Sequence, residues 1–222
     1  MIKLFKKIIE RLKFLKSRID EPIMRDVLIN KLIRKYNFKT YLEIGIDNGN
    51  NFNRINCLYK DSVDPAEKNY NHANPKYKVT SDVFFKSVAN EYFKYDIIFI
   101  DGLHHYEQVN RDIENSLKHL NEGGFIVLHD CNPKKEIHQK VPRESKLWNG
   151  DVWKSVVHFR STNNEYGCLT IDSDQGLGII SKKIKPYKIK FEHQLNYQSL
   201  EKNRNELLGL INVNDFKKKF FD

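Results

Sequence analysis

Short apolar runs that alternate with longer amphipathic stretches, from Tyr41 onward, constrain the fold of this chain most strongly. Residues 95–101 (YDIIFID) hold four consecutive apolar residues, a pattern typical of a strand buried on both faces. Apolar residues at every third or fourth position then predict a helix over 107–120. Because strands separated by helices form parallel sheets with right-handed crossovers, the pattern predicts an α/β fold. The other predicted strands are 40–45, 58–64, 77–80, 124–129 and a closing pair at 167–171 and 178–180.

The net charge of +9 on 222 residues lies at the two ends of the chain. Residues 1–18 carry +6 and residues 183–222 carry +4, whereas residues 19–182 carry −1. An enzyme that acts on nucleic acid needs positive charge around its catalytic face. The neutral middle therefore argues against a nucleic-acid partner, and the charge otherwise says little about the reaction.

The two ends are predicted to add helices to a central domain at 37–182. Residues 1–36 are expected to form two basic amphipathic helices, because 1–19 places apolar side chains on one face and basic side chains on the other. The first helix has three interpretations: packing on the domain or on a second subunit of a homodimer, lying on an anionic membrane surface, or reaching nucleic acid. We expect neither a secretory signal nor a membrane-spanning segment. Residues 183–222 are expected to form a C-terminal extension with a helix over 195–210.

The cysteines indicate the compartment. The chain has three cysteines, Cys57, Cys131 and Cys168. No two of them form a C-x-x-C pair, and an odd number does not make a complete set of disulfides. Free thiols of this kind are typical of a reducing environment. The sequence therefore predicts a cytoplasmic protein, with residues 1–19 as the segment that would hold it at the inner face of a membrane.

Polar and acidic residues stand at the carboxyl ends of the predicted strands. The first strand runs into Glu43, the second ends at Asp64, the fourth ends at Asp101, and the fifth ends at His129 and Asp130. Ligands of open parallel sheets bind outside these strand ends. We therefore expect one site that brings these side chains together.

The first two strand ends favour a nucleoside ligand. Gly45 and Gly49 allow a tight turn and a close approach to a ligand, since glycine has no Cβ. Asp64 stands 21 residues after Glu43, where a carboxylate can accept both hydroxyls of a ribose. The alternative for Asp64 is a turn residue before Pro65.

These motifs resemble class I S-adenosylmethionine (SAM)-dependent methyltransferases. The resemblance rests on E-x-G-x-x-x-G from Glu43, on Asp64, and on D-G-x-H-x-Y-E from Asp101. The stretch 95–130 is very similar to a bacterial small-molecule branch, which includes metal-dependent sugar O-methyltransferases of macrolide biosynthesis and enzymes linked to surface polysaccharides. The resemblance covers roughly 38–182. It implies a Rossmann-like fold, with a seven-stranded, mostly parallel sheet and helices on both faces.

The resemblance also implies how SAM would bind. Its methionine part would face Glu43, Gly45 and Gly49, and its ribose would face Asp64. Its adenine would lie beside Ser81 and Asp82. Asp101 would lie near the sulfonium, from which the methyl group leaves.

For the reaction itself, the resemblance implies His104 as the general base, because this histidine stands three residues after Asp101. A neutral imidazole can accept the proton of an acceptor hydroxyl near neutral pH. Asp101, His129 and Asp130 occupy the positions of the Mg²⁺ ligands of the macrolide-sugar enzymes. His129 departs from that pattern, where a carboxylate is usual. Two carboxylates and an imidazole suit a borderline divalent metal better than Mg²⁺, and a reaction without metal is the alternative.

The acceptor is expected to bind beside the polar loop 132–150, which we interpret as an acceptor loop or lid. Trp148 or Trp153 could stack on a sugar, although both are also typical core residues. Arg143 could bind a phosphate, and His105 is a further candidate.

The sequence thus predicts methyl transfer to a hydroxyl of a small polar acceptor, such as a sugar, nucleotide sugar or glycan precursor. Methyl transfer to nitrogen or to a phosphate oxygen, an RNA-binding module or RNA methyltransferase, and a non-catalytic scaffold are the alternatives.

Overall fold

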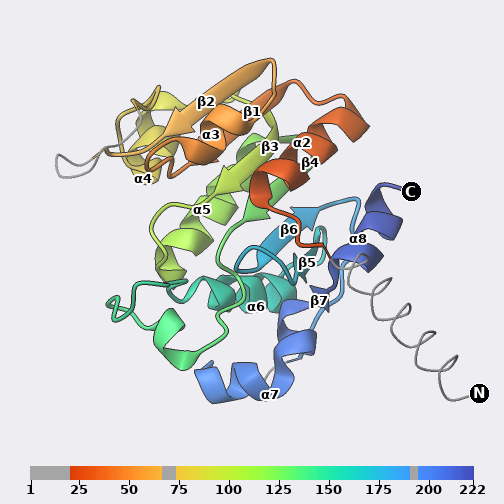
Figure 1. The fold of residues 1–222 in the computed structure, drawn as a ribbon. Helices are drawn as coiled ribbons and strands as arrows, with labels where there is room; N and C mark the ends of the chain where they lie inside the picture. The colour runs from red at the N-terminus through yellow and green to blue at the C-terminus, as the bar shows by residue number, and fades with distance from the viewer. Residues whose placement is uncertain (1–20, 67–73, 191–194) are drawn as a thin grey trace, which may run out of the picture.

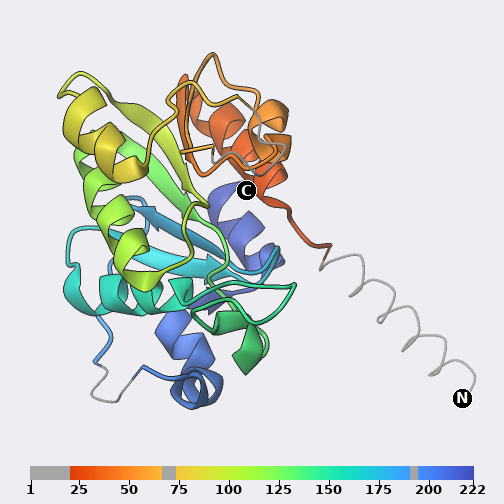
Figure 2. The same ribbon diagram turned by 90° about the vertical axis from the view of Figure 1, so that its left-hand side faces the viewer.

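The computed structural model describes residues 21–66, 74–190 and 195–222, and the first predicted helix, 1–19, lies outside them. One seven-stranded sheet, in the order β2-β1-β3-β4-β6-β5-β7, lies between two layers of helices (Figures 1 and 2). The strands are β1 (Thr40–Ile44), β2 (Tyr59–Val63), β3 (Tyr95–Ile100), β4 (Leu120–Leu128), β5 (Gly167–Ile171), β6 (Leu177–Ser181) and β7 (Leu210–Ile211). The longer helices are α2 (Arg25–Tyr36), α5 (Tyr106–His119), α6 (Val152–Thr162), α7 (Tyr197–Leu208) and α8 (Val213–Phe220).

The sheet is parallel except for β6. The strand pairs β2-β1, β1-β3 and β3-β4 are all parallel, as short apolar runs joined by helices require. β6 runs antiparallel to both β4 and β5, so β5 points the same way as β4. The prediction of a mostly parallel, seven-stranded sheet is therefore confirmed, including the closing pair.

Both faces of the sheet are buried. Successive side chains along each central strand point to opposite faces of the sheet, and a layer of helices covers each face. Ile97 and Phe99 of β3 pack with α2 and α8 on one face. Ile98 and Ile100 pack with α5, α6 and α7 on the other face. This two-sided burial explains why the β3 run lacks the polar alternation of a half-exposed strand.

The structure corrects one predicted strand. Residues 77–80 do not form a strand; they make a single bridge between Val63 and Tyr77 before a short helix, α4 (Ser81–Val83), and a π-helical turn (Phe84–Val88). The seventh strand is instead β7, which pairs in parallel with β5.

The C-terminal segment is part of this same fold. β7 extends the sheet, and Phe216 and Phe220 of α8 are buried against the face that α2 also covers. The predicted helix over 195–210 is α7, which ends at Gly209 with a left-handed backbone. Residues 183–222 therefore differ from the appended extension that we expected. Within the described residues, no helix has the length and apolar character needed to cross a membrane.

Candidate active site

The turn after β1 touches the end of β3. Gly45 has a φ of +83°, and a Cβ there would lie 2.3 Å from the Asp101 carbonyl oxygen and 2.5 Å from Gly102 Cα. An alanine would therefore collide with backbone and be strained in the left-handed region. Gly49, with a φ of +75°, immediately precedes α3 (Asn50–Arg54). Only glycine at position 45 allows the ends of these two strands to meet.

Asp64 supports the same turn from the end of β2. Its Oδ2 accepts hydrogen bonds from the backbone N–H groups of Ile46 at 3.0 Å and Asp47 at 3.3 Å. Its Oδ1 accepts the N–H of Ala66 at 2.7 Å, as a turn-forming aspartate does. The carboxylate thus shapes its turn, as one interpretation of the sequence expected, and it also lines a cavity.

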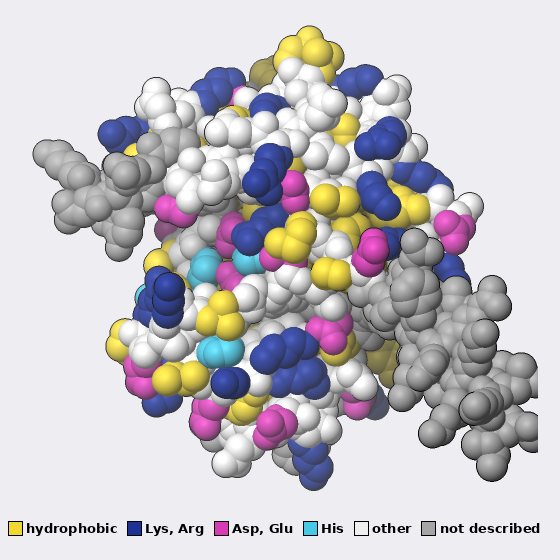
Figure 3. Space-filling view, in the orientation of Figure 1, with side chains coloured by type: hydrophobic (Ala, Val, Ile, Leu, Met, Phe, Trp, Pro, Cys, Tyr) yellow, Lys and Arg dark blue, Asp and Glu magenta, His cyan; other side chains and the backbone are white. Residues whose placement is uncertain are grey.

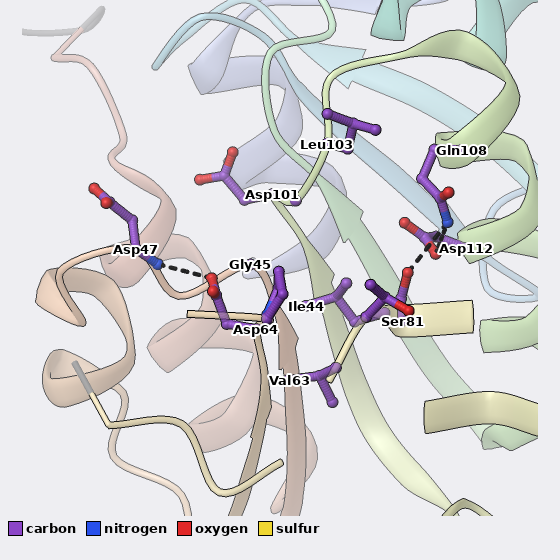
Figure 4. A pocket seen from close by; sticks show the side chains of 13 residues that line it. Ile44, Gly45, Asp47, Val63, Asp64, Ser81, Asp101, Leu103, Gln108 and Asp112 are labelled. Atoms are coloured by element: carbon purple, nitrogen blue, oxygen red, sulfur yellow. Dashed lines mark hydrogen bonds between the residues drawn. The ribbon is translucent and has the colours of Figure 1, made fainter. Parts of the chain in front are cut away.

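A cavity of about 520 Å³ opens along these strand ends (Figure 4). Gly45, Asp64, Ser81 and Asp101, four of the predicted cofactor residues, line it. Asp82 does not; its side chain is 47% exposed and pairs with Arg111 at 3.3 Å. The remaining lining residues are Ile44, Asp47, Val63, Pro65, Thr80, Gly102, Leu103, Gln108 and Asp112. Gln108 and Asp112, on α5, were not predicted from the sequence.

A second cavity, of about 250 Å³, lies on the other side of the β1 turn and shares Gly45, Asp47 and Asp101 with the first. Glu43 lines it and is 1% exposed. Its carboxylate accepts hydrogen bonds from the Tyr41 hydroxyl at 2.5 Å and the Asn51 amide at 3.1 Å. Burial nevertheless raises the pKa of Glu43 to about 7. A cation that entered this cavity would favour the ionised form.

The predicted catalytic residues meet beside both cavities. His104 Nε2 lies 3.3 Å from Asp101 Oδ1, and His104 Nδ1 lies 3.4 Å from Asp130 Oδ2. Burial by itself would lower the pKa of His104. The contact with Asp101 and the charges of Asp130 and Asp101 outweigh that effect and raise the pKa above its ordinary value of 6.5. The imidazole therefore lies between two carboxylates that favour its protonated form. Figure 3 shows histidine and acidic side chains together near the middle of this face.

His129 lies deeper, with its side chain 5% exposed. Its Nδ1 lies 2.9 Å from Asp130 and 3.3 Å from Asp101, and its Nε2 lies 3.3 Å from Asp174. Burial opposes protonation of His129, but Asp101 and the other carboxylates raise its pKa well above the ordinary value. For Asp101, burial is outweighed by His129 and His104, so its pKa falls below the ordinary value.

Arg25 and Asp174 belong to this cluster although no sequence motif identified them. Arg25, the first residue of α2, places Nη1 2.8 Å from Asp101 Oδ2 and Nε 3.1 Å from Asp174 Oδ2. Asp174 comes from the turn between β5 and β6, and burial is outweighed by His129 and Arg25, so its pKa is lowered. Long-range packing of three elements makes this arrangement, so no local pattern could have signalled it.

The metal prediction can be compared with the donors present. In the part of the chain that the structure describes, Asp101, His104 and Asp130 each offer a ligand atom, and these atoms lie within 4.8 Å of one another. This trio contains His104 in place of the expected His129. Two carboxylate oxygens and one imidazole nitrogen fit a borderline divalent cation better than the all-oxygen shell that Mg²⁺ prefers.

Three of the four predicted acceptor residues meet where the loop 132–150 places Trp148 beside His104. The Trp148 ring stacks on His104 with centroids 5.1 Å apart and an interplanar angle of 24°, and His105 meets it edge-on at 6.2 Å. The Arg143 guanidinium lies 5.7 Å from the centroid of the Trp148 ring. Trp153 is different, because it is fully buried in the core and donates its N–H to Gln139. Its position is that of a packing residue, away from an acceptor surface.

The end of this loop is attached directly to the catalytic segment. Gly150 has a φ of +59°, and a Cβ there would lie 1.9 Å from the His104 carbonyl oxygen. The Asp151 carboxylate, just before α6, accepts the Tyr106 backbone N–H at 2.7 Å and so caps the start of α5. These contacts set the position of His104 relative to Trp148.

Comparison with known proteins agrees with this architecture. Residues 42–131 match the model of a methyltransferase domain family. An uncharacterised protein of Acanthamoeba polyphaga mimivirus is 38% identical over 52 residues, which span only 23% of this chain and 24% of that protein.

Two solved structures resemble most of the fold. An O-methyltransferase from Bacillus cereus in complex with SAH (S-adenosylhomocysteine) has a TM-score of 0.50 and 15% identity, covering 77% of this chain and 87% of that one. A candidate O-methyltransferase from Klebsiella pneumoniae has a TM-score of 0.52 and 13% identity, covering 78% and 88%. Residues 42–131 therefore match a methyltransferase domain, and the chain has the Rossmann-like fold of these two structures.

Proposed function

We propose that this chain is a SAM-dependent O-methyltransferase that acts on a hydroxyl of a small polar acceptor. One observation carries the proposal: two cavities along the strand ends share Gly45, Asp47 and Asp101, and His104 lies 3.3 Å from that same Asp101. A bipartite cofactor can occupy both cavities with its reactive centre at the shared residues. The predicted base would then stand at the point of methyl transfer.

The two cavities differ in chemistry as the two halves of SAM do. In the larger one, Asp64 would accept the ribose hydroxyls with lone pairs that its backbone contacts leave available. In the smaller one, Glu43 would pair with the α-ammonium of the methionine part, and Arg25 and Arg54 line the same space for its carboxylate. Asp101 would face the sulfonium, whose positive charge a carboxylate stabilises.

The reaction needs alignment and proton removal more than covalent help. The acceptor oxygen forms a bond to the methyl carbon as the carbon–sulfur bond breaks, and the electron pair stays on sulfur. The acceptor proton passes to a ring nitrogen of neutral His104. Asp101 and Asp130 hold the ring from two sides and stabilise the imidazolium that results.

A divalent metal is part of the proposal as an alternative to the base. Asp101, His104 and Asp130 would hold it, and the ion would supply positive charge that lowers the pKa of the acceptor hydroxyl. A His104 nitrogen that binds a metal cannot accept a proton, so the two roles exclude each other at that atom. Activity that survives a strong chelator would assign His104 to the base role.

Sugars and glycan precursors are the proposed acceptors. Trp148 is half-buried beside His104 and offers an aromatic ring to the C–H face of a sugar. Arg143 beside that ring, and the basic residues of the loop 132–150, would suit a phosphorylated or nucleotide-linked acceptor.

The first test is cofactor binding by titration calorimetry. SAM and SAH should bind, and Asp64→Ala should weaken both by about 10- to 100-fold, since it removes the hydrogen-bond acceptor for the ribose. Glu114→Gln on the exposed side of α5 is the control for loss of one carboxylate. The second test is transfer of a labelled methyl group to a panel of nucleotide sugars and glycan precursors. A folded protein that binds neither SAM nor SAH would contradict the proposed function.

A further inference from the structure

Exposed aliphatic side chains surround the mouth of the candidate site. Four of them, each at least 42% exposed, are Leu103, Ile137, Val141 and Leu147. Three belong to the loop 132–150, and Leu103 lines the larger cavity next to His104. Single exposed apolar side chains are ordinary, whereas a gathered set marks a binding surface.

Hydrogen bonds within the loop keep the backbone segments that carry these side chains together. The Ser145 hydroxyl contacts the carbonyl oxygens of Ile137, at 3.4 Å, and of Leu147. The indole N–H of Trp148 donates to the carbonyl oxygen of the residue before Val141, at 2.6 Å. Figure 3 shows hydrophobic and basic side chains interspersed at the lower left of this face, where Figure 1 places the loop.

The loop is also basic, although the domain around it is not. Residues 132–150 hold five basic and two acidic side chains, whereas the rest of 19–182 carries a net charge of −4. Two of the loop lysines pair with acidic side chains. Lys135 and Lys146 are exposed and form no ion pair with any residue that the structure describes. Positive charge is therefore available beside the aliphatic side chains.

This combination fits an anionic lipid surface better than a protein or a nucleic acid. The cores of protein interfaces are depleted in lysine. Single-stranded nucleic acids stack on free aromatic rings, but Trp148 of this loop is half-buried against His104. At a bilayer, aliphatic side chains enter the headgroup region while lysine side chains extend to the lipid phosphates.

We propose that the loop 132–150 docks on an anionic bilayer, with its exposed aliphatic side chains and Leu103 in the headgroup region and with Lys135 and Lys146 on lipid phosphates. This surface differs from residues 1–19, for which the sequence alone suggested a membrane contact. Docking would place the mouth of the candidate site against the lipid headgroups. The inference goes beyond the proposed function, since it depends on exposure and charge and requires no methyl transfer.

Tryptophan fluorescence of the full chain can follow this loop separately from residues 1–19. The chain has two tryptophans, Trp148 in the loop and Trp153, which is fully buried in the core. On vesicles of phosphatidylglycerol and phosphatidylcholine, lipids with brominated acyl chains should quench the emission of Trp148. Trp148→Phe should abolish that quenching. Vesicles of phosphatidylcholine alone should bind at least about 10-fold more weakly, because they lack the negative surface charge.

Substitutions with matched controls test the two kinds of contact. Leu147→Ser should weaken partitioning onto the anionic vesicles about 3- to 10-fold, because one aliphatic side chain is lost. Lys146→Gln should weaken it about 5-fold. Leu58→Ser and Lys118→Gln change exposed residues just before β2 and in the last turn of α5, at the opposite edge of the sheet, and should keep the wild-type partitioning.

Three results would overturn the inference. Vesicle binding that leaves Trp148 unquenched would assign the contact to another segment, such as 1–19. Equal partitioning of Leu147→Ser and Leu58→Ser would remove the role of the loop. A dimer in analytical ultracentrifugation that Leu147→Ser dissociates, and Leu58→Ser does not, would assign this surface to a second copy of the chain.

The quenching measurement uses the wild-type protein, so a variant that fails to fold does not remove the test. SAH titration in the absence of vesicles tests the proposed function separately.

Discussion

Arg25 Nη1 lies 2.8 Å from Asp101 Oδ2, a contact between residues 76 positions apart in the chain. The same guanidinium reaches Asp174 through Nε, and the Arg25 backbone N–H also donates to Asp174 at 2.9 Å. Arg25 lies outside the stretch 42–131 that matches the methyltransferase domain, yet it binds the carboxylate at the centre of the site. The start of α2 is therefore part of the candidate site.

Arg25→Ala should destabilise the protein by about 2 kcal/mol, because it removes from Asp101 and Asp174 the cation that they share with each other in a largely buried cluster, and leaves them with the histidines alone. Arg25→Lys should recover only part of that loss, since an ammonium lacks the planar fork that contacts both carboxylates. Urea unfolding measures both effects. The control is Arg54→Ala, whose side chain is 70% exposed and 3.7 Å from Asp26, and whose change in stability should stay within about 0.5 kcal/mol. Equal stability of Arg25→Ala and wild type would contradict the structural role.

Gly45→Ala should abolish cofactor binding and destabilise the fold by about 2 to 4 kcal/mol, because the new Cβ would meet Asp101 backbone at 2.3 Å. Gly102→Ala is a matched control in the adjoining turn, where the nearest atom to a new Cβ is Ile44 Cγ2 at 3.6 Å. Thermal unfolding and SAH titration report both quantities. Similar behaviour of the two variants would show that the strand ends are not in the close contact described.

Glu43→Gln should raise the stability of the ligand-free protein at about pH 8 while weakening SAM binding. The folded state raises the pKa of Glu43 from 4.5 to about 7, so this group binds its proton more tightly when folded. Its contribution to stability therefore falls as pH rises between these two values. A neutral amide avoids that loss, on the order of 1 to 3 kcal/mol, but cannot pair with the methionine ammonium. Thermal unfolding at about pH 5 and about pH 8 checks the sign, and only the higher pH should show a gain.

Turnover should increase with pH as His104 loses its proton. Its pKa lies above 6.5 in the ligand-free protein, and only the neutral ring can accept the acceptor proton, so activity should increase as pH rises through that raised pKa. The contribution of His104 to the stability of the fold should instead decrease as pH rises. Ion pairs of a protonated histidine contribute fully below the unfolded pKa and are lost as pH rises through the folded one. His104→Asn should remove most turnover while SAH affinity changes less than about 3-fold. Loss of SAH affinity of the same size as the loss of turnover would contradict the base assignment.

The sequence predicted the strand positions well where burial is two-sided, as in β3 and β4, because a continuous apolar run has few alternatives there. It failed at 77–80, where only Tyr77 bridges to Val63 and a helix follows at once. It also assigned the residue after Ser81 to the adenine, whereas the helix turns Asp82 outward to Arg111. Side-chain direction in a short helix depends on what packs against it, which spacing alone does not contain.

The sequence by itself determined the α/β class and the row of acidic and histidine side chains at the strand ends, because parallel strands bring all their carboxyl ends to one edge of the sheet. Tertiary structure decided which further groups complete that row. Arg25 and Asp174 are brought together across 149 positions, and Asp112 enters the cavity from the side of α5. Contacts of this range depend on how whole helices pack on the sheet, and local periodicity carries no information about the partner that a given face will meet.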